Sequence, residues 1–153
     1  MSTPTQRLAE LGLTLPPVAK PLAAYTPAIT VGNQVWVSGQ LPLRDGKLVA
    51  TGRLGDAVEP AEGAEAAKVA ALNALAAVAD QAGALDNVAR ILKAVVFVAS
   101  TTDFTAQPQV ANGASELLGE VFGTPHVRSA VGVAVLPIDA PVEVELVAEL
   151  AAR

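Results

Sequence analysis

The segment HVRSAVGVAVLPIDAPVEVELVAEL, residues 126–150, constrains the fold more than any other part of the chain. Two apolar runs flank a turn that contains two prolines, a pattern that predicts a β-hairpin. Alternate side chains of a strand share one face of a sheet. If the branched apolar residues of both runs face the core, Arg128 and the glutamates of the second run lie together on the other face. That face is then either simply solvated or a binding site, and the pattern leaves both interpretations open.

Arg128 and Glu143 cannot meet within this predicted hairpin. A turn centred in PIDAP pairs Glu143 with a position near Val135. That position is about seven residues from Arg128, or about 23 Å at roughly 3.3 Å per residue. If the two side chains share a site, a second subunit or another element has to bring them together.

The rest of the chain predicts one α/β (α+β) domain over residues 1–153, with a mixed sheet and two helices on one face. The expected order is β-β-α-β-α-β-β. The predicted elements are a hairpin of 27–31 and 34–40, a short edge strand near 48–50, a helix from Pro60 to Gly83, a buried strand over 91–100, a helix near 109–122 and the final hairpin. Residues 1–24 predict an N-terminal surface arm, and Trp36 is expected in the core.

Composition excludes several classes of protein. Hydrophobic residues make up 52% of the chain and charged residues 16%, which excludes a disordered chain. The net charge of −5 and the scattered basic residues argue against nucleic acid as a partner. Without cysteine there is no disulfide or thiolate chemistry. No secretory signal or membrane span is recognisable, so a cytoplasmic protein is expected. The lone histidine, His126, has no second ligand at metal-binding spacing, so a metal site is not expected. We interpret it as a loop residue or as a contact at the rim of a site.

Three motifs resemble the Rid (YjgF) family of reactive-intermediate deaminases, also labelled endoribonuclease L-PSP-like. They are VSGQLP, the strand VFVAS followed by DF, and RSAVGVAVLPIDAPVEVELVA. The resemblance spans about Tyr25 to Ala148. It implies a chorismate-mutase-like fold, a trimeric assembly and clefts between subunits. The chain departs from the usual pattern in its N-terminal arm, in a longer 41–60 region, and at Leu117 and Leu118, which replace an aromatic pair.

The resemblance also implies roles for single residues. Arg128 corresponds to the arginine that anchors the substrate carboxylate, and Glu143 to the acid that orients water. The implied substrate-binding positions are Tyr25, Ser38, Gly39, Asn112 and Ala130. The match of Asn112 requires a short insertion within TAQPQVA, and Ala130 stands where the family often has cysteine.

The implied reaction is hydrolysis of a small enamine or imine acid, such as 2-aminoacrylate, to a 2-keto acid and ammonia. No metal or organic cofactor is required, and the expected partners are small imine or keto-acid carboxylates and further copies of the chain. One alternative is a non-catalytic trimer that binds carboxylate metabolites in a regulatory or chaperone-like role. A second alternative, endoribonuclease activity, is disfavoured by the acidic chain.

Overall fold

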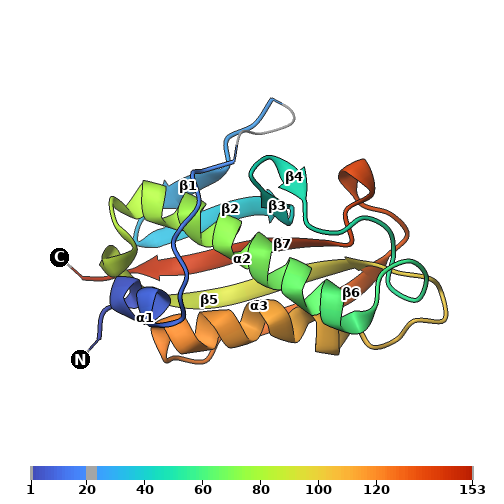
Figure 1. Cartoon of the computed structure of the whole chain (residues 1–153). Coiled ribbons are helices and arrows are strands. Elements are labelled where there is room, and N and C mark those ends of the chain that lie inside the picture. The colour runs from blue at the N-terminus through green and yellow to red at the C-terminus, as the bar shows by residue number, and fades with distance from the viewer. Residues whose placement is uncertain (1, 20–23, 153) are drawn as a thin grey trace.

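The computed structural model describes residues 2–19 and 24–152 (Figure 1). The helices are α1 (Pro4–Glu10), α2 (Pro60–Ala82) and α3 (Gln107–Phe122), with short 3-10 turns η1 (Leu85–Asn87) and η2 (Pro137–Asp139). The strands are β1 (Ala28–Val31), β2 (Gln34–Gln40), β3 (Leu43–Arg44), β4 (Lys47–Leu48), β5 (Val88–Ala99), β6 (Val127–Val133) and β7 (Val142–Leu150). The predicted order of the principal elements is confirmed. A separate two-stranded ribbon of β3 and β4 takes the place of the single edge strand expected near 48–50.

The main sheet has five strands in the order β1-β2-β7-β5-β6. Its neighbours are antiparallel except for β5 and β6, which are parallel, so the sheet is mixed as predicted. Both long helices lie on the same face of this sheet (Figure 1). The side chains of β7 alternate: Val142, Val144 and Leu146 are buried under the helices, while Glu143 and Glu145 are half-exposed on the other face. We call that other face the open face.

The predicted final hairpin is wrong. β6 and β7 are consecutive along the chain, but β5 lies between them and pairs with both. β6 runs parallel to β5, a pairing that requires a crossover, and α3 supplies it. The two apolar runs of the final segment therefore belong to strands that are not neighbours.

The predicted orientation of β6 is wrong as well. Arg128 pairs with Ala94, which pairs in turn with Leu146, and both partners are buried on the helix side of the sheet. Arg128 therefore faces α3, whereas Glu143 lies on the open face. The branched residues Val127 and Val131 point away from the helices and are 66% and 44% exposed. Limited space on the helix side of β6 explains why its branched residues face outward. A Cβ on Gly132 would lie 2.8 Å from atoms of both Gln107 and Ser100.

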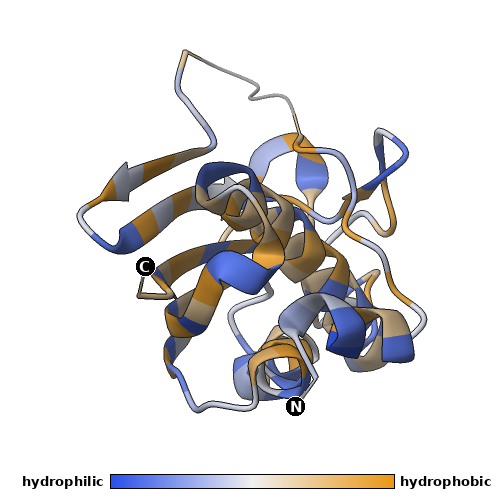
Figure 2. Cartoon of the chain, turned by 90° about the vertical axis from the view of Figure 1, so that its left-hand side faces the viewer, coloured by the Kyte–Doolittle hydropathy of each residue, from blue (hydrophilic) through white to orange (hydrophobic). Residues whose placement is uncertain are grey.

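The open face is unusually apolar for an exposed surface. Figure 2 shows hydrophobic and hydrophilic residues alternating along the strands. Large apolar residues exposed on this face are Ile29, Val31, Trp36, Val127 and Val131. Trp36 is 50% exposed, so its predicted place in the core is wrong. Its pairing with Val147, whose neighbours along β7 are buried, fixes it on the open face.

Local sequence signals fix α2, which covers the centre of the sheet. Glu59 and Glu62 form a capping box, Pro60 occupies the first helical position, and Gly83 ends the helix at φ 87°. Small residues let α3 approach closely, since a Cβ on Gly113 would overlap the backbone of Ala64. Among the helices of the described chain, none has the length and apolar character needed to cross a membrane.

The N-terminal arm is attached to the core at defined points. Thr3 and Gln6 form a capping box that starts α1, and Leu8 is buried at 3% exposure. The backbone N–H of Thr5 donates to Asp86 Oδ1 at 2.8 Å. This hydrogen bond lowers the pKa of Asp86 below its ordinary value. Residues 20–23 of the predicted arm lie outside the described residues.

Candidate active site

Arg128 is held by one side of α3. Its Nη1 donates to Asn112 Oδ1 at 2.7 Å and to Ser115 Oγ at 3.1 Å. Its Nη2 makes a longer contact of 3.5 Å with the carbonyl of Pro108. Ala130 follows two residues later on the same side of β6. The structure thus brings together three of the predicted site residues: Arg128, Asn112 and Ala130.

His126 extends this cluster through Ser115. Its Nε2 lies 2.9 Å from Ser115 Oγ, the oxygen that also accepts from Arg128. Burial lowers the pKa of His126, and the positive charge of Arg128 lowers it further. Because a lowered pKa favours the neutral imidazole, the ring can accept the hydroxyl proton of Ser115. The sequence interpretation missed Ser115, although its position three residues after Asn112 places both on one face of a helix.

Glu143 lies on the open face against Gly39. A Cβ on Gly39 would overlap the Glu143 carboxylate, so this approach requires glycine. β2 has an irregularity between Val37 and Gln40, and the strand meets β7 again only at Gln40. Burial raises the pKa of Glu143, and the charge of Glu145 raises it further. A carboxyl group with a raised pKa is suited to proton transfer.

Ser38 and Tyr25 lie near this second cluster. The Ser38 hydroxyl donates to the carbonyl of Pro27 at 3.1 Å, and its backbone N–H donates to the same carbonyl at 2.9 Å. Tyr25 comes two residues before Pro27 and is 47% exposed. Ser38, Gly39 and Glu143 are therefore close together, and Tyr25 lies on the segment that Ser38 holds.

The predicted residues thus form two half-sites that do not meet within the chain. One contains Arg128 and faces α3; the other contains Glu143 and lies on the open face. Phe97 pairs with both Glu143 and Val131, which places Glu143 two strands and three residues from Arg128. At about 4.8 Å per strand and 3.3 Å per residue, their backbones are about 14 Å apart. Arg128 and Glu143 therefore do not meet within one chain, as predicted, but the predicted separation of about 23 Å along a hairpin is wrong. A change of face and an intervening strand keep them apart.

The metal-ligating side chains do not gather at either half-site. In the part of the chain that the structure describes, no group of three or more His, Cys, Asp or Glu residues is placed to hold a metal ion.

Comparison with known proteins assigns the family. Residues 5–150 match the model of a family described as "YjgF/chorismate mutase-like, putative endoribonuclease". The chain belongs to the YjgF family. It is 44% identical to Protein TCP17 of Trypanosoma cruzi, over 94% of this chain and 91% of that protein. It is 30% identical to a 2-iminobutanoate/2-iminopropanoate deaminase of Dermatophagoides farinae, over 87% of this chain and 91% of that protein.

Two solved structures show how closely the fold is shared. A protein from Shewanella oneidensis, described as "a putative endoribonuclease", is 36% identical with a TM-score of 0.94, covering 97% of this chain and 100% of that one. TdcF of Escherichia coli, solved with bound serine, is 27% identical with a TM-score of 0.65, covering 90% of this chain and 94% of that one. These matches confirm the predicted YjgF/Rid family and the chorismate-mutase-like fold. The family model covers the arm from residue 5 onward and the whole 41–60 region.

Proposed function

We propose that this YjgF protein hydrolyses small enamine or imine acids resembling 2-aminoacrylate to 2-keto acids and ammonia. The observation that carries the proposal is the set of hydrogen bonds made by the Arg128 guanidinium. Both N–H groups of Nη1 are used by Asn112 and Ser115, which fixes the plane of the group. The Nε atom has no hydrogen-bond partner among the described residues, and Nη2 has only its long contact with Pro108. One edge of the fork thus remains for a carboxylate, which arginine can bind through two parallel hydrogen bonds.

Glu143 supplies the second part of the proposed reaction. Its raised pKa lets the carboxylate take a proton from water as the water attacks the imine carbon, and lets the acid return a proton to the departing ammonia. Imines hydrolyse readily in water, so positioning plus modest acid–base assistance is sufficient catalysis. Tyr25, Ser38 and the Gly39 amide shape the cleft in this proposal, and Asn112 and Ala130 line its arginine side.

The proposal places each cleft between two subunits of a homotrimer. The two half-sites lie on opposite faces of one sheet, so a complete site needs a second copy. Two surfaces support such a contact. The open face exposes large apolar residues, including Trp36 and Val131. Among the strands of the described residues, β6 lies at the edge of the sheet and has no partner on its outer side. A contact between two different surfaces closes into a ring when its rotation allows, and a ring of three has three equivalent clefts.

A cytoplasmic location is part of the same proposal. Because an imine hydrolyses spontaneously in water, an enzyme that accelerates its removal has to work in the compartment that produces it. We place that compartment in the cytoplasm.

The decisive experiment compares Arg128→Ala and Arg128→Lys with the native protein in ammonia release from enzymatically generated 2-aminoacrylate. We expect the alanine variant to lose about 100-fold in kcat/KM, because two charge-assisted hydrogen bonds to the carboxylate are removed. The lysine variant keeps the charge but cannot form two parallel hydrogen bonds to the carboxylate, so its activity should be intermediate. Circular dichroism and sedimentation should show both variants folded and assembled. Undiminished hydrolysis by the alanine variant would contradict the proposal.

A non-catalytic carboxylate-binding trimer is the second candidate. Ala130, beside Arg128 on β6, offers no proton donor or acceptor to a bound ligand, which favours binding without chemistry. Calorimetry would then show keto acids binding to the native protein but not to Arg128→Ala, without any acceleration of ammonia release. RNA cleavage, which the family description mentions, is tested in the same preparations by a metal-free RNA assay; the net charge of −5 argues against it.

A further inference from the structure

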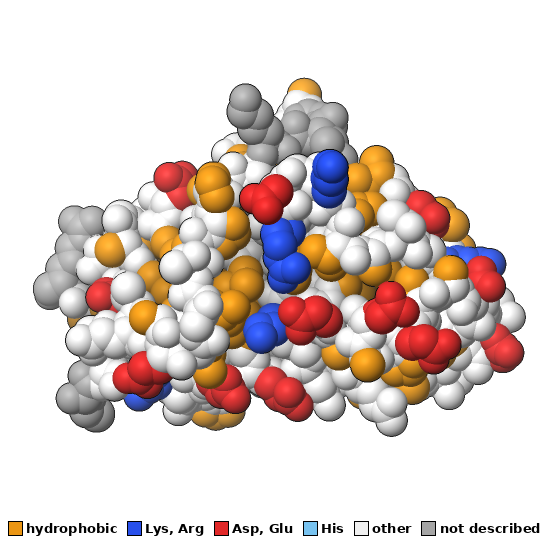
Figure 3. Space-filling view, in the orientation of Figure 1, with side chains coloured by type: hydrophobic (Ala, Val, Ile, Leu, Met, Phe, Trp, Pro, Cys, Tyr) orange, Lys and Arg blue, Asp and Glu red, His pale blue; other side chains and the backbone are white. Residues whose placement is uncertain are grey.

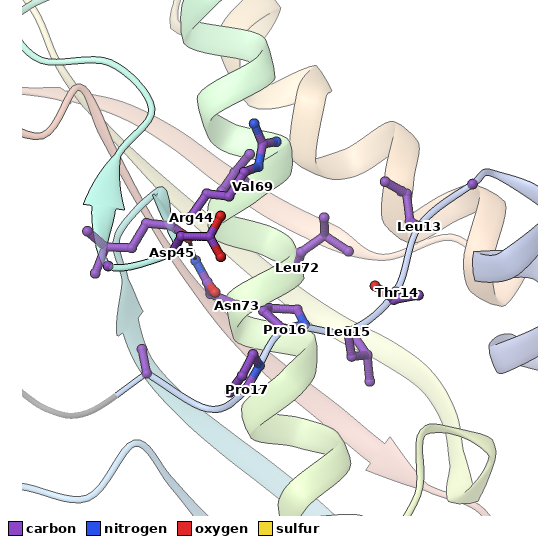
Figure 4. A pocket seen from close by; sticks show the side chains of 14 residues that line it. Leu13, Thr14, Leu15, Pro16, Pro17, Arg44, Asp45, Val69, Leu72 and Asn73 are labelled. Atoms are coloured by element: carbon purple, nitrogen blue, oxygen red, sulfur yellow. Dashed lines mark hydrogen bonds between the residues drawn. The ribbon is translucent and has the colours of Figure 1, made fainter.

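The N-terminal arm and the β3–β4 ribbon, which lie outside the candidate clefts, meet over α2 and line a cavity. Residues 12–17 of the arm form one side, the turn of the β3–β4 ribbon forms another, and α2 forms the floor (Figure 4). The cavity has a volume of about 720 Å³, which is within the range of small-molecule sites. It lies on the helix side of the molecule, and none of the candidate catalytic residues lines it.

The arm side of the cavity is apolar and fixed in place. Leu13, Leu15 and Pro16 line the cavity from the arm, and Leu72 lines it from α2 (Figure 4). Leu13 and Leu15 are partly buried against the hydrophobic core. The arm is anchored upstream by the buried side chain of Leu8 and by the hydrogen bond from Thr5 to Asp86. This wall is therefore part of the folded structure, and it suits a hydrocarbon group.

The opposite end of the cavity is lined by a polar side chain that is almost entirely buried. Asn73 of α2 is only 4% exposed. Its Nδ2 donates to the carbonyls of Leu41 and Leu43 at 3.0 and 2.9 Å, so both amide hydrogens are used. No residue in the described part of the chain donates to its Oδ1. This oxygen is not one of the enclosed, unpaired side-chain atoms of the described residues, so it stays open to an approaching donor, and a ligand in the cavity that Asn73 lines can supply one.

One cation and one carboxylate lie at the same end. Arg44 and Asp45 belong to the β3–β4 ribbon, and the Asp45 side chain extends toward α2 near Asn73 (Figure 4). Within residues 2–19 and 24–152, the ionic partner of Arg44 is Glu65, at 3.9 Å between two side chains that are each 59% exposed, which is a weak interaction. Figure 3 shows Lys and Arg side chains gathered at the centre of this face with Asp and Glu beside them. The polar end thus offers a positive group, a negative group and a neutral acceptor.

We propose that this cavity binds a small zwitterion with an apolar body, which is the chemistry of a free amino acid with an aliphatic side chain. The ammonium group of the ligand donates to Asp45 and to Asn73 Oδ1. Its carboxylate pairs with Arg44, and its side chain packs between Leu15 and Leu72. The site is separate from the proposed clefts, so this inference holds or fails independently of the deaminase activity.

The test measures binding of L-leucine to the full chain by calorimetry and by the shift in Tm. Two analogues each lack one charge: 4-methyl-2-oxopentanoate has no ammonium group, and 3-methylbutylamine has no carboxylate. The keto acid is measured on the Arg128→Ala variant, because keto acids are also expected to bind at Arg128. We expect L-leucine to bind and to raise Tm, and each analogue to bind at least about tenfold more weakly, because each loses one charge-assisted contact. Failure of L-leucine to bind, or equal binding of the analogues, would overturn the proposal.

Matched variants assign the binding to this cavity. Asp45→Asn removes the carboxylate but suits the positive φ of 54° at this position, so it should fold and weaken L-leucine binding about tenfold or more. Glu65→Gln removes a nearby negative charge outside the cavity and frees Arg44, so it should bind L-leucine as well as or better than the native protein. Equal losses in both variants would show a general charge effect and overturn the proposal. So would binding that survives Asp45→Asn but disappears in Arg128→Ala.

Discussion

At the scale of single residues, the position of the Glu143 carboxylate depends on the missing side chain of Gly39. A methyl group there would occupy the space of the carboxylate, so Gly39→Ala should displace Glu143 without changing its chemistry. We expect kcat for imine hydrolysis to fall about 100-fold, the lower end of the range for general acid–base assistance, with little change in keto-acid binding. Steady-state kinetics and calorimetry on the same preparation measure both quantities.

A double-mutant cycle shows whether Gly39 acts through Glu143. Once Glu143 is replaced by alanine, the added methyl group at position 39 has no carboxylate to displace. Gly39→Ala should then cause no further loss of activity, so the two effects should be far from additive. Additive losses would show that Gly39 has another role.

His126 makes stability depend on pH in a defined direction. Its pKa is lowered in the folded chain from the ordinary value of 6.5, so the unfolded chain binds more protons just below that pH. The free energy of unfolding should therefore fall as the pH drops from about 6.5 toward the folded pKa. Above about pH 6.5, the contribution of His126 should be constant. Arg128 is the charged group that faces the ring, and it opposes protonation.

Replacing His126 by glutamine isolates this contribution. Glutamine can still hydrogen-bond to Ser115 but does not titrate. Denaturation by urea between roughly pH 5 and 8 should show a shallower loss of stability on acidification for His126→Gln than for the native protein. Parallel profiles for the two proteins would contradict the assignment.

At the scale of elements, sequence patterns predict α2 well because its signals are local. Pro60, the glutamates of the first turn and Gly83 mark its two ends without reference to any other part of the chain. The same holds for the hairpin of β1 and β2, which the tight turn between them specifies.

The orientation of β6 could not be predicted because it depends on a distant partner. Periodicity shows that Arg128 and Val131 lie on opposite faces but cannot tell which face meets a helix. The crossover through α3 makes β6 an edge strand, and the helix lies so close that only small or polar side chains fit beneath it. The usual rule, branched residues toward the core, therefore fails here. Residue identities in the candidate site came from motifs, whereas their faces and the bridging Ser115 required the structure.

The contact between α2 and α3 gives a prediction about stability. A Cβ on Gly113 would overlap the backbone of Ala64, which cannot move aside as a flexible side chain can. Gly113→Ala should therefore destabilise the protein by about 1–3 kcal/mol, the usual cost of overpacking, despite the better helix propensity of alanine. Gly119→Ala is the matched control, because nothing lies within 4 Å of its added Cβ in the same helix. The control should gain up to about 1 kcal/mol in chemical denaturation. A neutral or stabilising Gly113→Ala would show that the helices can separate without loss.

At the scale of the whole molecule, the two half-sites lead to a complementation experiment. If each cleft takes Arg128 from one subunit and Glu143 from the next, Arg128→Ala and Glu143→Gln are separately inactive but complement each other in mixed trimers. After dissociation and reassembly of an equal mixture, each cleft has one chance in two of a native arginine and one in two of a native glutamate. About a quarter of the native activity should return.

The pattern of recovery distinguishes this arrangement from a site within one chain. A site built from a single chain would stay inactive in the mixture, because every chain carries one of the two substitutions. A second experiment measures the activity of native protein mixed in equal amounts with a chain that carries both substitutions. A cleft shared between subunits should again retain about a quarter of the native activity, whereas a site within one chain would retain about half. The two mixtures together show whether Arg128 and Glu143 of one site come from different chains, as their positions on opposite faces of the sheet lead us to expect.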